Sequence, residues 1–139
     1  MVNNFDQLKQ IADLVAAQFG SAAEVVIHDF TGELDHTIVY IVNGHVTNRT
    51  IGDAPTQSFL KYMNVNHPRK SMEKIRHISH LPNGRIIRSS TANFFDEDGT
   101  LNSSLCINQD ITDLVSLENA VKGLSESGHF ETSVLSTNG

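Results

Sequence analysis

The chain has 139 residues and a formal net charge of −6, with 39% hydrophobic and 19% charged residues. This size and balance fit one compact domain and leave no room for a second. The acidic charge disfavours DNA binding by the domain itself, and every apolar run is far shorter than the ~20 residues that cross a bilayer. With a single cysteine, Cys106, and no signal-peptide pattern, we expect a cytoplasmic protein without an internal disulfide.

The N-terminal segment has the pattern of an amphipathic helix. Apolar residues recur at helical spacing from Phe5 to Phe19, and Gly20 supplies a stop. Asn4 and Gln7 resemble a capping box at the start. We therefore predict a first helix with one apolar face.

Two strands are predicted after this helix, at Ala23 to Phe30 and at His36 to Val42. The dipeptide Asn43-Gly44 follows at once and indicates a tight turn. Beyond it, the residues from His45 to Thr47 either pair back as a short strand or begin a loop.

The middle of the chain is basic and less regular. A short helix is predicted at Ala54 to Met63, and Arg76 to His80 alternates as a strand does. Seven of the ten Lys and Arg residues lie between Lys61 and Arg88, where Glu73 is the only acid. This flank either attracts an anionic effector or an acidic partner surface, or is simply a solvated face.

The last third predicts a hairpin followed by a helix. Ile86 to Phe95 and Leu101 to Ile107 alternate apolar with small polar residues around an acidic turn at 96–99. Asp110 or Thr112 can cap a final helix. Its apolar residues fall at alternating spacings of three and four: Leu114, Leu117, Val121 and Leu124. Residues 1–124 are thus expected to form the domain, and 125–139 a polar linker or disordered tail.

The order of these elements indicates an α+β fold. We expect a single antiparallel sheet of about five strands, with short helices on one face and flanking N- and C-terminal helices. The hairpin is rich in small hydrogen-bonding side chains, more than packing requires, which suggests the lining of a polar cavity.

Five residues form the predicted ligand-binding set: His28, Asn43, Ser90, Cys106 and Asn108. Ser90, Cys106 and Asn108 have the parity to share one face of paired strands. The alternatives are a core histidine at position 28 and a ladder of Ser and Asn that faces water.

No catalytic, metal or cofactor site is predicted. His77 and His80 are three residues apart, so a strand places them on opposite faces, and no carboxylate or cysteine cluster completes a metal shell. Cys106 lies in an apolar run, where a thiol is inert. The acidic turn at 96–99 lacks the spaced ligands of a calcium loop.

A longer set of residues carries a family resemblance. In order along the chain it comprises His28-Asp29, His36, Asn43 to Thr47 with Arg49, Gly52-Asp53, Ser89-Ser90, and Leu105 to Asn108 with Asp110. This set resembles the YheO-like PAS domain family over roughly Phe5 to Val115. Asn48 departs from the family pattern, because relatives often have Gly before the arginine.

The resemblance implies a PAS-like sensory domain of a transcriptional regulator similar to the D-arginine utilisation repressor. Its expected partners are a small metabolite, such as an amino acid, and a second copy of the chain. It implies DNA contact only through a helix-turn-helix domain, which is absent from this chain. The alternatives are a ligand-free interaction or dimerisation module and, less favoured, a small-molecule enzyme.

Overall fold

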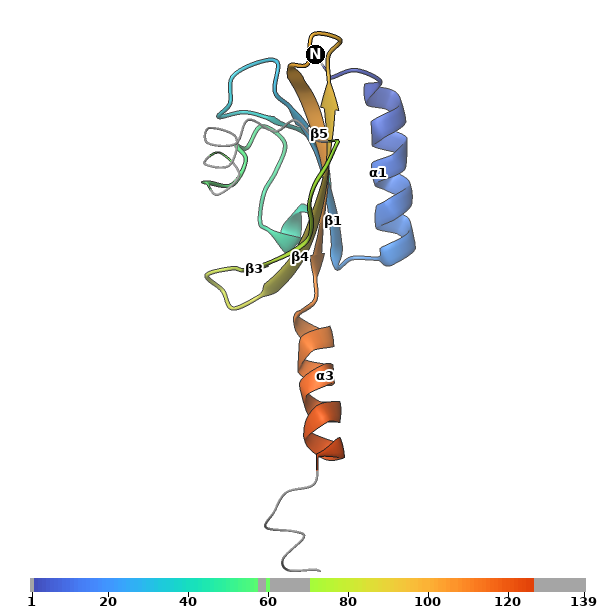
Figure 1. Ribbon diagram of the computed structural model, residues 1–139, viewed down its shortest axis with the longest axis vertical. Coiled ribbons are helices and arrows are strands. Elements are labelled where there is room, and N and C mark those ends of the chain that lie inside the picture. Colours follow the sequence, from blue (N-terminus) through green and yellow to red (C-terminus); the bar gives the residue numbers. More distant parts are fainter. Residues whose placement is uncertain (1, 58–59, 61–70, 127–139) are drawn as a thin grey trace, which may run out of the picture.

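The computed structural model describes residues 2–57, 60 and 71–126. Half of the helix predicted at Ala54 to Met63, residues 58, 59 and 61–63, lies outside these residues, as do 64–70 and 127–139. The described elements follow the order α1 (Phe5–Phe19), β1 (Ala23–Asp29), β2 (Ile38–Val42), the 3-10 helix η1 (Gly44–Val46), β3 (Met72–His80), β4 (Ile86–Phe95), β5 (Leu101–Asp110) and α3 (Thr112–Ser125). The predicted α+β class, with one antiparallel sheet and terminal helices, is confirmed (Figure 1).

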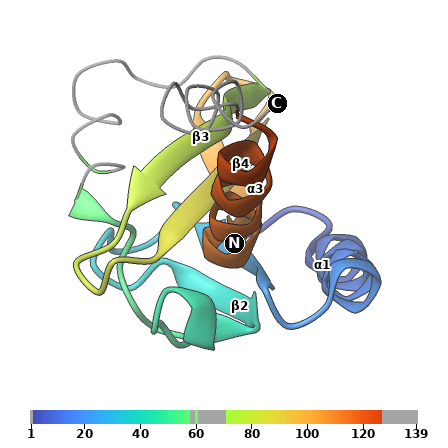
Figure 2. The same cartoon turned by 90° about the horizontal axis from the view of Figure 1, so that it is seen from below.

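The sheet contains five strands in the order β2-β1-β5-β4-β3. Helix α1 lies along one face of this sheet, while η1 and the loop that follows it lie on the other (Figures 1 and 2). Side chains alternate between these faces. The face toward α1 carries the larger apolar core, made by Val2, Leu8, Ala12, Ala16, Val25, Ile27 and Leu105.

The start and end of α1 were predicted correctly, but its cap was not. Asn4 has a left-handed backbone with φ 54°, and its side chain makes no capping hydrogen bond, so the predicted capping box is wrong. Gly20 ends the helix with φ 82°, a conformation that favours glycine. After β2, the chain forms the 3-10 turn η1 rather than a returning strand.

Strand β3 is longer and less regular than its predicted core at Arg76 to His80. Its register against β4 shifts between positions 73 and 77, and Lys74 and Arg76 have positive φ values of 49° and 55°. The Arg76 backbone N–H donates to the Ser90 hydroxyl at 3.0 Å. Ser90 thus satisfies a backbone donor that the irregular ladder leaves unpaired.

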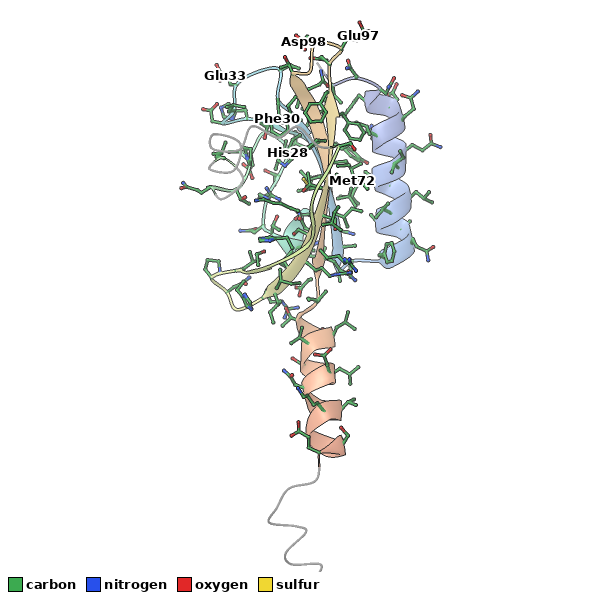
Figure 3. The ribbon with its side chains drawn as sticks, in the orientation of Figure 1. His28, Phe30, Glu33, Met72, Glu97 and Asp98 are labelled. Atoms are coloured by element: carbon green, nitrogen blue, oxygen red, sulfur yellow. The ribbon has the colours of Figure 1, made fainter. Side chains whose placement is uncertain are left out.

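The β4–β5 hairpin contains a register shift that affects the whole sheet face. The acidic turn closes as predicted, with Glu97 and Asp98 at its tip (Figure 3). A bulge between Phe94 and Phe95 then displaces the pairing by one residue. Because side chains alternate, this shift changes which β5 residues share a face with the β4 residues from Ile87 to Phe94.

Helix α3 extends away from the sheet beyond the end of β5 (Figure 1). None of its residues is buried. Its first turn is held by Asp110, which accepts hydrogen bonds from the Thr112 backbone N–H at 3.0 Å and from the Thr112 hydroxyl at 2.6 Å. Arg85 Nε also donates to Asp110, at 2.8 Å. A membrane span would need a longer and more apolar helix than any that the described residues form.

Asp110 is predicted to anchor this helix. Burial raises the pKa of Asp110, but the hydrogen bonds from Thr112 and Arg85 lower it by more. The net pKa lies below its ordinary value, so the charged carboxylate is stabilised. The N-cap position is Ile111, so neither Asp110 nor Thr112 occupies it as predicted. Replacing Asp110 with alanine should still destabilise the domain by about 1 kcal/mol in urea unfolding, because the variant loses hydrogen bonds at the start of α3. It should also speed hydrogen exchange in the first turn of α3. Asp113→Ala, an exposed change in the same turn, is the control; equal exchange in the two variants would contradict an anchoring role.

Candidate functional site

A partly open cavity lies on the sheet face opposite α1. Its volume is about 110 Å³. Strand β5 contributes Cys106 and Asn108, and neighbouring strands contribute side chains with the matching parity. The described residues that line it are His28, Arg49, Pro55, Thr56, Lys74, His77, Ser79, Ser89, Thr91, Cys106 and Asn108. Most of them are polar, so the cavity is suited to a small polar molecule.

A buried carboxylate organises one wall of this cavity. Glu24 on β1 is 0% exposed. Its Oε2 accepts hydrogen bonds from the Thr47 backbone N–H at 3.1 Å and from the Thr47 hydroxyl at 2.6 Å. Its Oε1 accepts from Asn108 Nδ2 at 2.8 Å and from Arg49 Nη2 at 3.3 Å. These donors compensate the desolvation of the charge and fix the Arg49 and Asn108 side chains.

The turn after β2 brings these donors to Glu24. Gly44 lies so close to Arg49 that an added Cβ would be 2.4 Å from the Arg49 carbonyl oxygen, which explains the glycine. The Arg49 backbone N–H closes the turn on the Gly44 carbonyl at 3.0 Å. Asn48 has φ 56°, a value that asparagine tolerates better than most residues. Asn48 therefore fills a position where glycine is also suited.

His28 is a neutral, fixed part of the same face. Its Nδ1 lies 2.8 Å from the Thr37 hydroxyl, and its ring stacks on Phe30 with centroids 5.6 Å apart. Both rings lie on the side of the sheet away from α1 (Figure 3). Burial first and the Arg49 charge second lower the pKa of His28 from 6.5 to about 3. The imidazole is therefore uncharged at neutral pH.

Cys106 is chemically quiet in this setting. Its thiol is buried and accepts a hydrogen bond from the Thr91 hydroxyl at 3.4 Å. Burial raises the pKa of Cys106, although Thr91, Ser104 and Arg49 act in the opposite direction. A protonated thiol is a poor nucleophile, so this setting favours a role for Cys106 in lining the cavity wall.

The structure brings together three of the five predicted site residues: His28, Cys106 and Asn108 line the cavity. Ser90 does not, because the bulge at Phe94 pairs Ser89 with Asn108 and Thr91 with Cys106. The expectation that Ser90 shares their face is therefore wrong by one residue. Asn43 also lies elsewhere: its amide donates to the carbonyl oxygens of Gly20 and Ala23, at 3.2 and 2.9 Å.

Among the residues of the site that were not predicted from sequence, four are central to its geometry: Glu24, Arg49, Ser89 and Thr91. Glu24 gave a usable signal, since a lone acid within the apolar run of β1 needs a buried partner. Arg49 was noted only as part of the family pattern. Ser89 and Thr91 face the cavity because of the register shift between Phe94 and Phe95, and no turn motif in the hairpin sequence predicts that shift.

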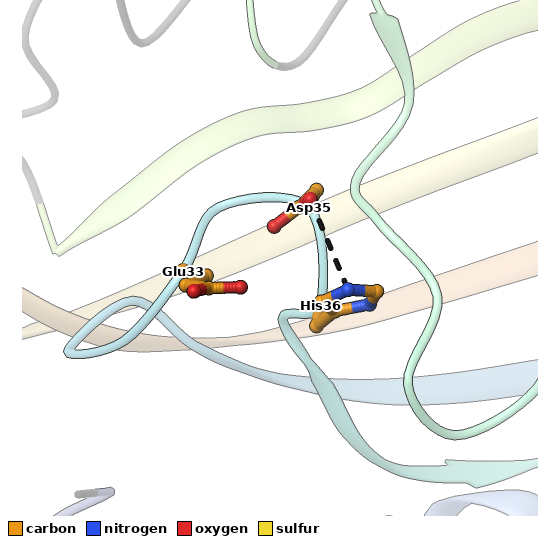
Figure 4. Close-up of side chains that lie close together, drawn as sticks. All are labelled: Glu33, Asp35 and His36. Carbon is orange, nitrogen blue, oxygen red and sulfur yellow. Dashed lines mark ion pairs between the residues drawn. The ribbon is translucent and has the colours of Figure 1, made fainter.

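A second cluster lies in the loop before β2. Glu33, Asp35 and His36 each offer a ligand atom, and these atoms lie within 4.8 Å of one another (Figure 4). His36 Nδ1 donates to the Gly52 carbonyl at 2.9 Å, which leaves Nε2 at 3.8 Å from Asp35. All three side chains are exposed, as acidic surface groups without a metal commonly are. The cluster fits a solvated loop.

Residues 2–126 match the family model described as "YheO-like PAS domain". The dark structure of the blue-light photoreceptor Aureochrome1 LOV is 14% identical, with a TM-score of 0.47 over 80% of this chain and 94% of that one. The structure of an RNA-binding Light-Oxygen-Voltage receptor is 13% identical, with a TM-score of 0.48 over 86% of this chain and 38% of that one. Among curated proteins, none matches this chain.

The family match and the five-stranded antiparallel sheet together identify a PAS-type fold. Since the family model covers residues 2–126, which include all of the described residues, the chain belongs to the YheO-like PAS domain family.

Proposed function

We propose that this chain is the ligand-sensing domain of a cytoplasmic transcriptional regulator, and that a small metabolite occupies the cavity beside Arg49. The observation that carries the proposal is a polar cavity with side chains fixed before any ligand binds, since Glu24 already holds Arg49 and Asn108. Preorganised polar groups give a small ligand orientation and specificity without further ordering.

The signal is proposed to leave through α3. Asn108 lines the cavity, and Asp110, two residues later on the same strand, holds the first turn of α3. A ligand that contacts Asn108 therefore acts on the strand end that positions the helix. The ligand changes the position of α3 only if it binds more tightly to one of two positions of that strand end than to the other.

A second copy of the chain is the proposed partner of α3. Leu114, Leu117, Val121 and Leu124 are 57%, 62%, 58% and 88% exposed. Their spacing of three and four residues forms a continuous apolar seam, and no described part of the chain covers it. Pairing two such helices would link two sensory domains. DNA contact is assigned to another part of the regulator, in keeping with the net charge of −6.

Ligand binding is tested by thermal unfolding with a broad panel of amino acids and other small metabolites. A ligand that binds only the folded state raises the melting temperature, and a concentration of about one hundred times Kd corresponds to about 2.7 kcal/mol. We expect at least one metabolite to stabilise the domain without being consumed. Consumption would indicate an enzyme. No response across the panel would contradict sensing.

Dimerisation is tested by size-exclusion chromatography with light scattering. The parent chain is expected to be a dimer, and Leu117→Asp a monomer, because the aspartate places a charge in the centre of the apolar seam. Ser116→Asp adds the same charge at an exposed neighbouring position and should leave the dimer intact. A monomeric parent, or a dimer that survives Leu117→Asp, would contradict pairing through α3.

The exposed seam on α3 also favours one alternative, a dimerisation module that binds no ligand. This alternative requires the seam but gives no role to the polar cavity. The thermal panel separates the two, because only the sensor responds to a metabolite.

A further inference from the structure

We propose that the cavity selects a small carboxylate with a hydrogen-bond donor on the adjacent carbon, a 2-hydroxy or 2-amino acid, and that Arg49 binds its carboxyl group. This inference rests on the proposed sensory function and adds the chemical class of the ligand.

The charges around the cavity are unequal. Its described lining contains two cations, Arg49 and Lys74, and no acidic residue. Glu24 lies behind this wall, is fully buried, and already accepts the four hydrogen bonds described above. Its charge offsets that of Arg49. A lining with no carboxylate among its described residues favours a small anion over a small cation.

Arg49 presents donors that the described residues do not use. Its Nε donates to the Thr47 hydroxyl at 2.8 Å, and its Nη2 donates to Glu24. Among the described residues, Nη1 has no hydrogen-bond partner, and the Arg49 side chain is 15% exposed. A guanidinium held on one edge can bind a carboxylate with its other edge, and its planar fork matches the two oxygens.

Asn108 supplies the complementary acceptor. The Glu24 carboxylate only accepts hydrogen bonds, so the group that Asn108 turns toward it must be the amide NH₂. The amide oxygen of Asn108 is therefore left for another donor. A hydroxyl or ammonium group beside the ligand carboxylate provides one, and the Ser89 hydroxyl, paired across from Asn108, lies in the same lining.

The size of the cavity limits this class to small members. The volume of the cavity is about 110 Å³. It is well below the roughly 300 Å³ at which pockets for drug-sized ligands begin. Lactate and alanine are therefore suitable probes.

Isothermal titration of the full chain with both enantiomers of lactate and of alanine tests the class. Propionate lacks the hydrogen-bond donor on the carbon next to the carboxylate, whereas lactamide and alaninamide lack the carboxylate. At least one of the four acids should bind, with propionate and the matching amide each at least about tenfold weaker, the usual effect of one lost charged hydrogen bond. Equal binding of acid and amide would overturn the proposal and leave a sensor of another ligand.

If none of these probes binds, the thermal panel decides what has failed. A response to some neutral or cationic metabolite overturns only the carboxylate class. A complete lack of response overturns this proposal and the sensory function together.

Variants test whether Arg49 makes the selection. Arg49→Gln alone removes the counter-charge of the buried Glu24 and is expected to destabilise the domain strongly. The double variant Glu24→Gln with Arg49→Gln, in which neither side chain is charged, is therefore measured beside it. The folded double variant should lose at least about tenfold in affinity for the acid and show no preference for acid over amide. Arg88→Gln removes an exposed cation from the opposite sheet face and should bind as the parent does. An acid preference that survives in the double variant would overturn the role of Arg49.

Discussion

Replacing Arg49 with methionine is expected to destabilise the domain by about 3 to 5 kcal/mol, the usual loss when one partner of a buried ion pair is removed. Glu24 is 0% exposed, so its carboxylate cannot recover solvation in the folded state. The variant also removes the donor at 3.3 Å and the Arg49 Nε hydrogen bond that fixes Thr47. Urea unfolding at neutral pH measures the difference.

Two comparisons make this result specific. The double variant Glu24→Gln with Arg49→Met should be more stable than Arg49→Met alone, because the buried charge is gone. Arg85→Met breaks a pair whose arginine is 41% exposed and should have a clearly smaller effect than Arg49→Met. If Arg49→Met changed stability no more than Arg85→Met, the Glu24 network would not hold this wall of the cavity.

His28 is expected to make the domain sensitive to acid. The folded pKa of His28 is about 3, against 6.5 for an exposed histidine. Between these values the unfolded chain binds a proton at this position and the folded chain does not. Stability is thus fully present above about pH 6.5 and falls by about 1.4 kcal/mol per pH unit below it. From pH 6.5 to pH 4 this amounts to roughly 3 kcal/mol.

The His28→Asn variant isolates this effect. Asparagine does not titrate, so the stability difference between parent and variant should shrink by roughly 3 kcal/mol as the pH falls from 6.5 to 4. Urea unfolding at a series of pH values measures it, and His80→Asn, at an exposed position, should run parallel to the parent. If the free energies of unfolding of the parent and of His28→Asn changed in parallel with pH, His28 would have an ordinary pKa and its side of the cavity would be solvated.

Periodicity predicted the two terminal helices and the main strands because burial of one face imposes a repeat on the sequence. Phe5 to Phe19 and the seam from Leu114 to Leu124 show that repeat directly, although one helix is packed and the other is exposed. Pattern alone cannot separate these cases. What covers an apolar face is decided by tertiary or quaternary contacts.

The candidate site was predicted in part for a related reason. His28, Cys106 and Asn108 share a face through simple alternation on paired strands, which sequence parity captures. Ser90 was assigned to the wrong face because the register shifts between Phe94, which pairs with Ser103, and Phe95, which pairs with Leu101. This shift changes the parity of β4 relative to β5. Glu24 and Arg49 lie 25 residues apart, and only the turn around Gly44 brings them together.

The most direct test is a ¹H–¹⁵N correlation titration of the parent chain with the metabolite that most raises its melting temperature. Binding in the cavity should shift the amide signals of Thr91, Cys106 and Asn108, and the shifts should continue through Asp110 into the first turn of α3. Shifts confined to the α1 face, with the signals of β5 and α3 unchanged, would contradict both the ligand site and its connection to the helix.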